Sequence, residues 1–240
     1  MTQADPLCLV TRPQPEAARF AQRVEREMGM GCLLSPLLKI IPLSPPDQLG
    51  DARGVILTSA RGAEALGRWG VEKETPCFAV GDKTAKAAQS LGFQPTVAHG
   101  DAESLLALLL DLRPAHPLIH IRGAHSRGDI ARRLTEAGLP CREIIAYRQV
   151  KQGLTEAARE ALGGGQPVIA PLFSPRTAEA LRAALPPGAR PLIAALSPAV
   201  AQAFWHADVV ALRPTEDALL SAMRGLPVIR AWVEKAGMQD

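Results

Sequence analysis

Short apolar runs alternate with amphipathic stretches along the chain. In residues 15–28 and 126–137, for example, apolar residues recur at the three- and four-residue spacing of one helix face. Short runs that are apolar throughout predict strands buried on both sides of a sheet. These runs are residues 7–10, 54–57, 77–80, 118–121, 168–172 and 192–196. Because strand and helix alternate, the sequence predicts an α/β fold with parallel sheets covered by helices.

The chain also contains an internal repeat. Residues 57–66, LTSARGAEAL, match residues 172–181, LFSPRTAEAL, at seven of ten positions. A second match places Arg12 over Arg122. The chain therefore contains four segments in the order A, B, A′, B′, where A and A′ are the segments around Arg12 and Arg122, and B and B′ contain residues 57–66 and 172–181. Two assemblies fit this order equally: A with B and A′ with B′, or A with B′ and B with A′. Extended stretches at residues 35–43 and 142–150 end the two A units. Two such stretches can pair as a ribbon between two similar domains of about 110 residues each.

Composition and charge exclude several classes of protein. Apolar residues make up 47% of the 240-residue chain, enough for buried cores, whereas aromatic residues make up only 4%. The net charge is +3 and no long basic run occurs, so nucleic-acid binding is disfavoured. Four widely spaced cysteines without a C-x-x-C pattern disfavour zinc. Since the sequence shows no export signal and no membrane-spanning run, we expect a cytoplasmic protein that binds neither metal nor membrane.

The histidines and tryptophans give weaker signals. His116, His120 and His125 lie close together in the sequence. A predicted strand intervenes, which disfavours a shared metal site. Trp69 and Trp205 follow amphipathic stretches, and we expect both to pack at helix ends.

Four predicted strand-to-helix turns carry small hydroxyl or glycine residues. They are Thr58-Ser59, Gly81-Asp82-Lys83-Thr84, Ser174-Pro175 and Ser197-Pro198. A helix N-terminus offers unpaired N–H groups and partial positive charge, so such turns suit carboxylates or phosphates. Each hydroxyl taken alone also fits a simple helix cap. Arginines recur at comparable points, at Arg12, Arg61, Arg122 and Arg176. This repetition favours an anion-binding cleft between the domains.

The only tyrosine, Tyr147, lies in the second extended stretch. A phenol has an ordinary pKa of about 10, so it can donate a hydrogen bond or assist a leaving hydroxyl while it is neutral. A half-buried tyrosine that only packs fits the sequence equally well. The residue is therefore a candidate for the cleft, with packing as the alternative.

The ordered motifs resemble the uroporphyrinogen-III synthase family. They are V-T-R-P at residues 10–13, L-T-S-A-R-G-A-E-A at 57–65, A-V-G-D-K-T-A at 79–85, A-Y-R-Q at 146–149 and F-S-P at 173–175. The resemblance covers nearly the whole chain. It implies the assembly of A with B′, with residues 1–36 and 152–240 in one α/β domain and residues 40–145 in the other. Residues 37–39 and 146–151 are then the β-ribbon linkers, and the ligand cleft lies between the domains.

The resemblance also implies a reaction. Hydroxymethylbilane, a linear tetrapyrrole with eight carboxylates, loses its hydroxyl to give an azafulvene. The terminal ring then attacks through a spiro intermediate, which inverts ring D and yields uroporphyrinogen III with net loss of water. The electron-rich pyrroles stabilise the cation themselves, so no cofactor is needed and positioning is the main task of the enzyme.

Carried over position by position, the resemblance assigns the cleft to a set of residues. They are Thr58, Ser59, Arg61, Thr84, Arg122, Ser174 and Tyr147, and the phenol of Tyr147 is the favoured proton donor. Where many relatives have a glycine and threonines, this sequence reads Leu196-Ser197-Pro198-Ala199, and Ser197 is the nearest substitute. Arg12 joins the substrate-binding set through its place in the repeat.

Two hypotheses of function follow, beside a third in which the chain is a degenerate scaffold and its cleft is merely a seam between domains. The first is a lyase of tetrapyrrole biosynthesis that acts as a monomer in the cytoplasm and receives its substrate by transient handover from hydroxymethylbilane synthase. The alternative is a non-catalytic, two-lobed binding protein for a polyanionic small molecule.

Overall fold

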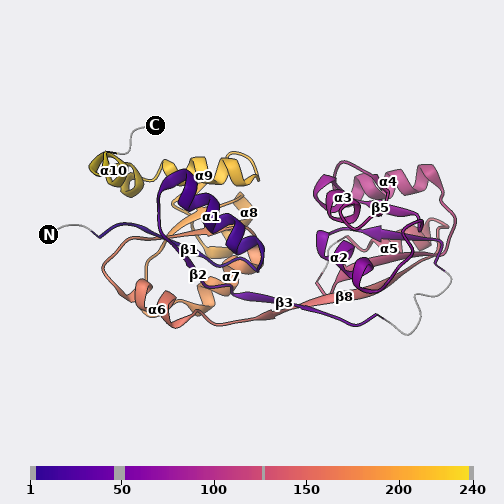
Figure 1. The fold of residues 1–240 in the computed structure, drawn as a ribbon, viewed down its shortest axis with the longest axis horizontal. Helices are drawn as coiled ribbons and strands as arrows, with labels where there is room; N and C mark the ends of the chain where they lie inside the picture. The colour runs from indigo at the N-terminus through magenta and orange to yellow at the C-terminus, as the bar shows by residue number, and fades with distance from the viewer. Residues whose placement is uncertain (1–3, 46–51, 126–127, 238–240) are drawn as a thin grey trace. The chain divides into compact units, whose positions relative to one another are not determined.

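The structure is a computed structural model that describes residues 4–45, 52–125 and 128–237. The chain divides into two compact units: unit 1 contains Met1–Lys39 and Val150–Asp240, and unit 2 contains Ile40–Gln149. Each unit has one sheet with parallel strand pairs and helices beside it (Figure 1). The predicted α/β fold is confirmed.

Unit 1 contains a five-stranded sheet in the order β11-β10-β9-β1-β2, and its neighbouring strands run parallel. Its strands are β1 (Leu7–Val10), β2 (Cys32–Leu34), β9 (Val168–Leu172), β10 (Leu192–Ala195) and β11 (Val209–Val210). Its helices are α1 (Glu16–Met28), α6 (Glu156–Gly163), α7 (Pro175–Ala184), α8 (Pro198–Phe204), α9 (Glu216–Arg224) and α10 (Pro227–Ala236).

Alternate residues of the central strands feed two apolar clusters, one on each face of this sheet. Cys8 and Val10 of β1 pack with side chains of α1, α9 and α10. Leu9, between them, packs with side chains of α6, α7 and α8. Successive side chains of a strand point to opposite faces, so a strand that is apolar throughout serves both layers. This double burial is why β1 reads as an uninterrupted apolar run.

Unit 2 contains a six-stranded sheet in the order β3-β8-β7-β4-β5-β6, in which the pairs from β8 to β6 are parallel. Its strands are β3 (Leu38–Pro42), β4 (Gly54–Leu57), β5 (Cys77–Ala79), β6 (Pro95–Val97), β7 (Leu118–Gly123) and β8 (Cys141–Lys151). Its helices are α2 (Ala60–Arg68), α3 (Asp82–Gln89), α4 (Ala102–Leu112) and α5 (Ile130–Glu136).

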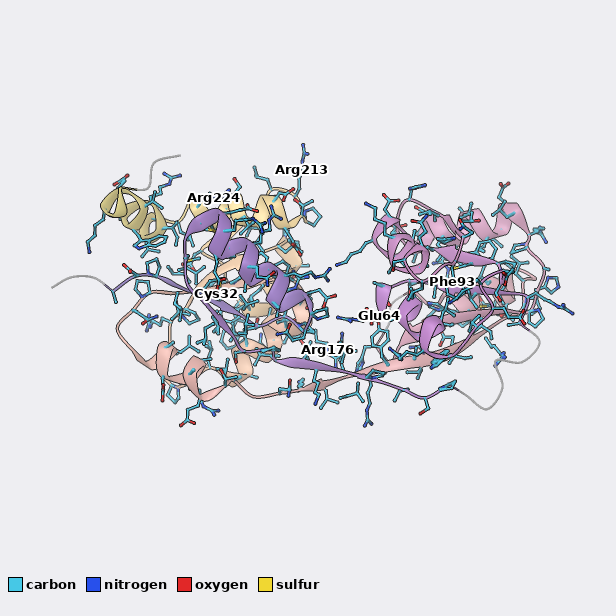
Figure 2. All side chains as sticks on the ribbon, viewed as in Figure 1. Cys32, Glu64, Phe93, Arg176, Arg213 and Arg224 are labelled. Carbon is cyan, nitrogen blue, oxygen red and sulfur yellow. The ribbon has the colours of Figure 1, made fainter. Side chains whose placement is uncertain are left out.

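The core of unit 2 has the same two-sided arrangement. Val55 and Leu57 of β4 pack with side chains of α2 and α3, in a cluster that includes the fully buried Phe93 (Figure 2). Ile56 packs with side chains of α4 and α5 on the other face. Both faces of β4 are therefore covered, which holds the carboxyl end of the strand, and the turn that follows it, on a rigid base.

The chain passes from one unit to the other within β3 and again within β8. These two strands are neighbours in the sheet. Beyond the ends of β3, the Leu43 N–H donates to the Ala146 carbonyl at 2.9 Å and the Gln152 N–H donates to the Leu37 carbonyl at 2.8 Å. Unit 2 is thus one continuous segment, whereas unit 1 combines the beginning and the end of the chain.

Two local predictions need correction. The helix expected over residues 126–137 begins at Ile130, because Gly128 and Asp129 have φ of 99° and 43°, values that a right-handed helix does not accept. Residues 126–127 lie outside the described residues. Trp69 packs at the end of α2 as expected, but Trp205 at the end of α8 is 77% exposed.

Candidate functional site

The carboxyl ends of β4 and β7 border a pocket of about 270 Å³ in unit 2. We call it the unit 2 pocket. Its lining residues are Thr58, Ser59, Val80, Ala102, Gly123, His125, Ile130 and Tyr147. Ligands of parallel α/β sheets bind at this end of the strands, where loops and helix N-termini meet. Three of the predicted site residues, Thr58, Ser59 and Tyr147, are therefore brought together around one pocket.

Ser59 is both a helix cap and a pocket residue. It precedes α2 in an extended conformation, and its Oγ accepts a hydrogen bond from the Gly62 N–H at 3.2 Å. The same Oγ lies 3.1 Å from the Tyr147 hydroxyl, at hydrogen-bonding distance. The cap bond leaves Ser59 free to contact Tyr147 as well, since one hydroxyl can accept two hydrogen bonds and donate one.

Tyr147 is held in place by an irregularity between β7 and β8. Arg122 pairs with Ile145, but the next residue, Gly123, pairs with Tyr147, so β8 carries one extra residue at this point. Such a bulge redirects a side chain that regular pairing would send elsewhere. A Cβ atom on Gly123 would lie 2.6 Å from two ring carbons of Tyr147. Only glycine leaves room for the ring in this position.

Four polar residues form a chain behind the pocket. Thr58 Oγ1 lies 3.0 Å from His120 Nε2, and His120 Nδ1 lies 3.7 Å from Glu143 Oε1. The other carboxylate oxygen of Glu143 lies 2.5 Å from the Arg122 guanidinium. Arg122 also donates to the carbonyls of Gly123 and Ala124. The strand end that carries Gly123 is therefore tied to the carboxylate of β8.

His120 is neutral at pH 7. Its side chain is 1% exposed, and this burial lowers its pKa to about 4. Glu143 raises the pKa by attraction and Arg122 lowers it by repulsion, but burial is the larger effect. His120 Nδ1 makes no hydrogen bond within the described residues. The Thr58 hydroxyl therefore contacts a neutral ring, not a cation.

The remaining predicted residues have other contacts. Arg61 pairs with Glu64, whose position on α2 is marked in Figure 2, at 3.0 Å. Thr84 is 5% exposed in the first turn of α3 and does not line the unit 2 pocket. Arg122 lies behind the pocket, in the polar chain.

Three predicted residues belong to unit 1. Arg12 pairs with Glu216 at 2.6 Å, and its guanidinium lies 3.9 Å from the centre of the Phe173 ring. Ser174 caps α7 by accepting from the Thr177 N–H, whereas Ser197 makes no cap hydrogen bond to α8. These contacts show where the side chains lie within unit 1 and assign them no ligand.

Sequence reasoning missed the supporting residues. From the sequence, His120 is a candidate only for a metal site, and Glu143 and Gly123 carry no recognised signal. A histidine inside an otherwise apolar strand, 118–121, is a signal that a buried polar partner exists. In the described part of the chain, no three histidine, cysteine or acidic side chains are grouped as a metal site would require. Nor does any helix described here have the length and apolar character needed to cross a membrane.

Comparison with known proteins decides the family. The sequence model of the family described as uroporphyrinogen-III synthase HemD matches residues 18–221, most of the chain. The chain belongs to the uroporphyrinogen-III synthase family. It is accordingly an enzyme, a lyase of tetrapyrrole biosynthesis. The family resemblance found in the sequence is confirmed.

Solved structures of uroporphyrinogen-III synthases share the fold. The chain is 15% identical to the enzyme from Helicobacter pylori 26695, with a TM-score of 0.69 over 92% of this chain and 99% of that one. It is 18% identical to a mutant enzyme from the extremely thermophilic bacterium Thermus thermophilus, with a TM-score of 0.56 over 97% of this chain and all of that one. Among curated proteins, none is significantly similar in sequence.

Proposed function

We propose that the chain converts hydroxymethylbilane to uroporphyrinogen III, with inversion of ring D and loss of water, and that the unit 2 pocket takes part in this reaction. The observation that carries the proposal is the contact between the Tyr147 and Ser59 hydroxyls at the carboxyl end of β4. A phenol and an alcohol at this distance can form a hydrogen bond in which either hydroxyl is the donor.

Tyr147 is the proposed proton donor. When the hydroxyl of the substrate leaves, a proton from the phenol allows it to depart as water, and the phenolate is reprotonated by the proton that the substrate loses on ring closure. Ser59 lies at hydrogen-bonding distance from the phenol oxygen and can orient it. The cation left on the substrate is spread over its pyrrole rings, so no strong base or metal is required. This agrees with the described lining of the pocket, which includes the hydroxyls of Thr58, Ser59 and Tyr147.

The carboxylates of the substrate need donors, and helix N-termini supply them. Ser59 and Gly81 stand at the N-terminal ends of α2 and α3, where backbone N–H groups and the helix dipole favour anions. Arg61, in the first turn of α2, adds a cation. We propose the same role in unit 1 for Ser174 and Ser197. We also propose that Thr84 and Arg12 bind the substrate, although Thr84 is buried and Arg12 pairs with Glu216.

The isomer ratio of the product tests this function. The full chain incubated with freshly prepared hydroxymethylbilane should give mainly the III isomer. Without enzyme, the substrate closes directly to the I isomer, so a reaction that yields only the I isomer rejects the proposal. Tyr147→Phe, purified in the same way, controls for contaminating activity. Calorimetry with small anions covers the alternative of a non-catalytic binder, which would bind them and leave the isomer ratio unchanged.

The setting of the reaction is also a proposal. We propose that the chain acts as a monomer in the cytoplasm and receives its substrate from hydroxymethylbilane synthase by transient contact. The substrate is unstable in solution, so direct transfer would limit its closure to the wrong isomer. We further propose that residues 1–36 with 152–240, and residues 40–145, act as the two substrate-binding domains.

A further inference from the structure

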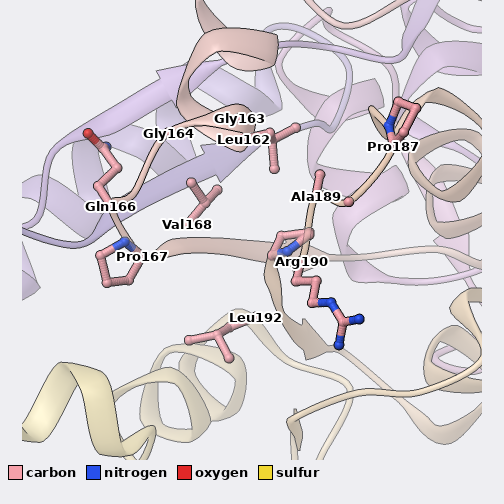
Figure 3. A pocket seen from close by; sticks show the side chains of 12 residues that line it. Leu162, Gly163, Gly164, Gln166, Pro167, Val168, Pro187, Ala189, Arg190 and Leu192 are labelled. Carbon is pink, nitrogen blue, oxygen red and sulfur yellow. The ribbon is translucent and has the colours of Figure 1, made fainter.

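Unit 1 contains two adjoining cavities at the end of the sheet where β9 and β10 begin. One, of about 490 Å³, is lined by Arg182, Leu185, Ala189, Arg190, Pro191, Leu192, Phe204, Trp205, His206 and Asp208. We call it the Trp205 pocket. The other, of about 460 Å³, is drawn in Figure 3. The loop at residues 189–192 lines both, and Arg190 extends from this loop (Figure 3).

The Trp205 pocket is separate from the proposed substrate residues of unit 1. Leu192 is the first residue of β10, and Asp208 directly precedes β11. Ser174 and Ser197 follow the carboxyl ends of β9 and β10 instead. Because these strands run parallel, one set of residues lies at the amino ends of the strands and the other at their carboxyl ends. The pocket therefore has no part in the function proposed above.

Trp205 is the unusual residue of this pocket. Its side chain is 77% exposed, although large aromatic side chains normally bury most of their area. Its backbone has φ of 87°, a conformation that is costly for a bulky residue and that often marks a functional site. The Arg182 guanidinium lies 4.4 Å from the centre of the ring. One cation can cover only one face of an indole, so the other face is available for stacking.

The pocket also contains two guanidinium groups, and neither forms an ion pair with a carboxylate of the described residues. Arg182 donates to the Ala203 carbonyl at 2.9 Å and has no acidic partner within the described residues. Arg190, exposed on its loop, pairs with no described side chain. The one acidic residue, Asp208, accepts a hydrogen bond from the Ile193 N–H at 2.6 Å. Two guanidinium groups thus border a space next to an open aromatic face.

We propose that the Trp205 pocket binds a small molecule with a planar aromatic ring and a phosphate group. The ring would stack on Trp205, and the phosphate would accept hydrogen bonds from Arg190 and Arg182. Arginine binds phosphate oxygens through paired N–H donors, and a phosphate has enough oxygens for two such groups. A volume of about 490 Å³ is ordinary for a small-molecule site.

Adenosine 5′-monophosphate is a suitable probe because it combines both groups, and adenosine and inorganic phosphate each carry one. Nuclear magnetic resonance of the indole N–H groups of the full chain reports on the site directly. Trp69 and Trp232 are internal controls, since their indole N–H groups donate to Leu43 and Asp5. The Trp205 signal is assigned by its loss in Trp205→Gly, a change that suits the positive φ. We expect the nucleotide to shift the Trp205 signal alone.

Arg190→Gln tests the charge, and Arg213→Gln is its matched control. Both arginines are exposed in unit 1, but Arg213 does not line the pocket. Loss of a charged hydrogen bond should weaken nucleotide binding about ten-fold or more in Arg190→Gln. Arg213→Gln should bind as the unchanged protein does, and adenosine and phosphate alone should bind at least about ten-fold more weakly than the nucleotide. The proposal is overturned if the nucleotide leaves the Trp205 signal unmoved, or if Arg190→Gln binds it unchanged.

Discussion

The Tyr147 hydroxyl lies 3.1 Å from the Ser59 hydroxyl, although 88 positions separate the two residues in the chain. Ser59 follows β4 and caps α2, whereas Tyr147 lies on β8. One oxygen is therefore fixed by a helix N-terminus and the other by a strand bulge. Because both supports are rigid, the geometry of the pair does not depend on a flexible loop.

Tyr147→Phe should lower turnover by about 100-fold, the usual value of a positioned proton donor. The ring and its packing remain, so the affinity for product should change little. Steady-state kinetics and product binding measured on the same preparation separate the two effects. Ser59→Ala, which keeps the phenol but removes its partner, should cause a smaller loss. Equal losses of turnover and affinity in Tyr147→Phe would instead indicate a binding role.

Gly123→Ala should displace Tyr147. The added methyl group would lie 2.6 Å from the ring, so the ring must move. Overpacking of this kind costs about 1–3 kcal/mol of unfolding free energy. Turnover should fall toward that of Tyr147→Phe. Gly153→Ala is the control, since a Cβ there meets nothing within 4 Å and the backbone φ is not positive. Full activity in Gly123→Ala would show that the position of the ring is unimportant.

His120 should make the fold less stable in mild acid. Burial lowers the pKa of His120 from 6.5 to about 4. Between these pH values the unfolded chain therefore binds a proton at His120 that the folded chain does not bind. The free energy of unfolding is therefore highest above pH 6.5. It declines as the pH falls toward 4, by up to about 3 kcal/mol. Urea unfolding at several pH values measures this decline.

His120→Gln removes the titrating group and should flatten the decline between pH 6.5 and 4. The matched control is His116→Gln, because His116 is exposed and pairs with no acidic side chain of the described residues. That variant should keep the pH dependence of the original protein. If His120→Gln also keeps it, another group is responsible.

Ser174 and Ser197 offer a matched pair for the energy of a helix cap. Both precede a proline that begins a helix, but only Ser174 accepts a hydrogen bond from its helix, from the Thr177 N–H at 3.2 Å. Ser174→Ala should therefore cost about 1 kcal/mol of unfolding free energy. Ser197→Ala should cost a few tenths at most. Urea unfolding checks both, and equal costs would contradict the cap assignment.

Much of the fold could be predicted because each element depends on local signals. A strand covered on both faces must be apolar throughout, so β1, β4 and β9 were visible as short runs with the observed bounds. The serines before α2 and α7 are recognisable as caps because a serine that directly precedes an amphipathic stretch is also a local signal. Trp205 was not predictable in this way, because its exposure depends on what fails to pack against it.

The support of the candidate site was harder to predict than its lining. Thr58 and Ser59 follow a clear strand and stand out as hydroxyls in a turn. Gly123 matters only because a one-residue bulge brings Tyr147 over it, and a bulge has no reliable sequence signal. Glu143 matters because it faces His120 and Arg122 from a neighbouring strand. Such partners depend on sheet register, which a single sequence does not reveal.

The path of the chain through β3 and β8 affects the order in which the protein can be made. Leu7 of β1 pairs with Val168 of β9, so one side of β1 has no partner until most of the polypeptide has been synthesised, although β2 can pair with its other side earlier. Residues 40–149 contain nearly all partners for their own sheet and can close it earlier. During translation, the side of β1 that pairs with β9 should therefore stay open to chaperones until β9 has been synthesised.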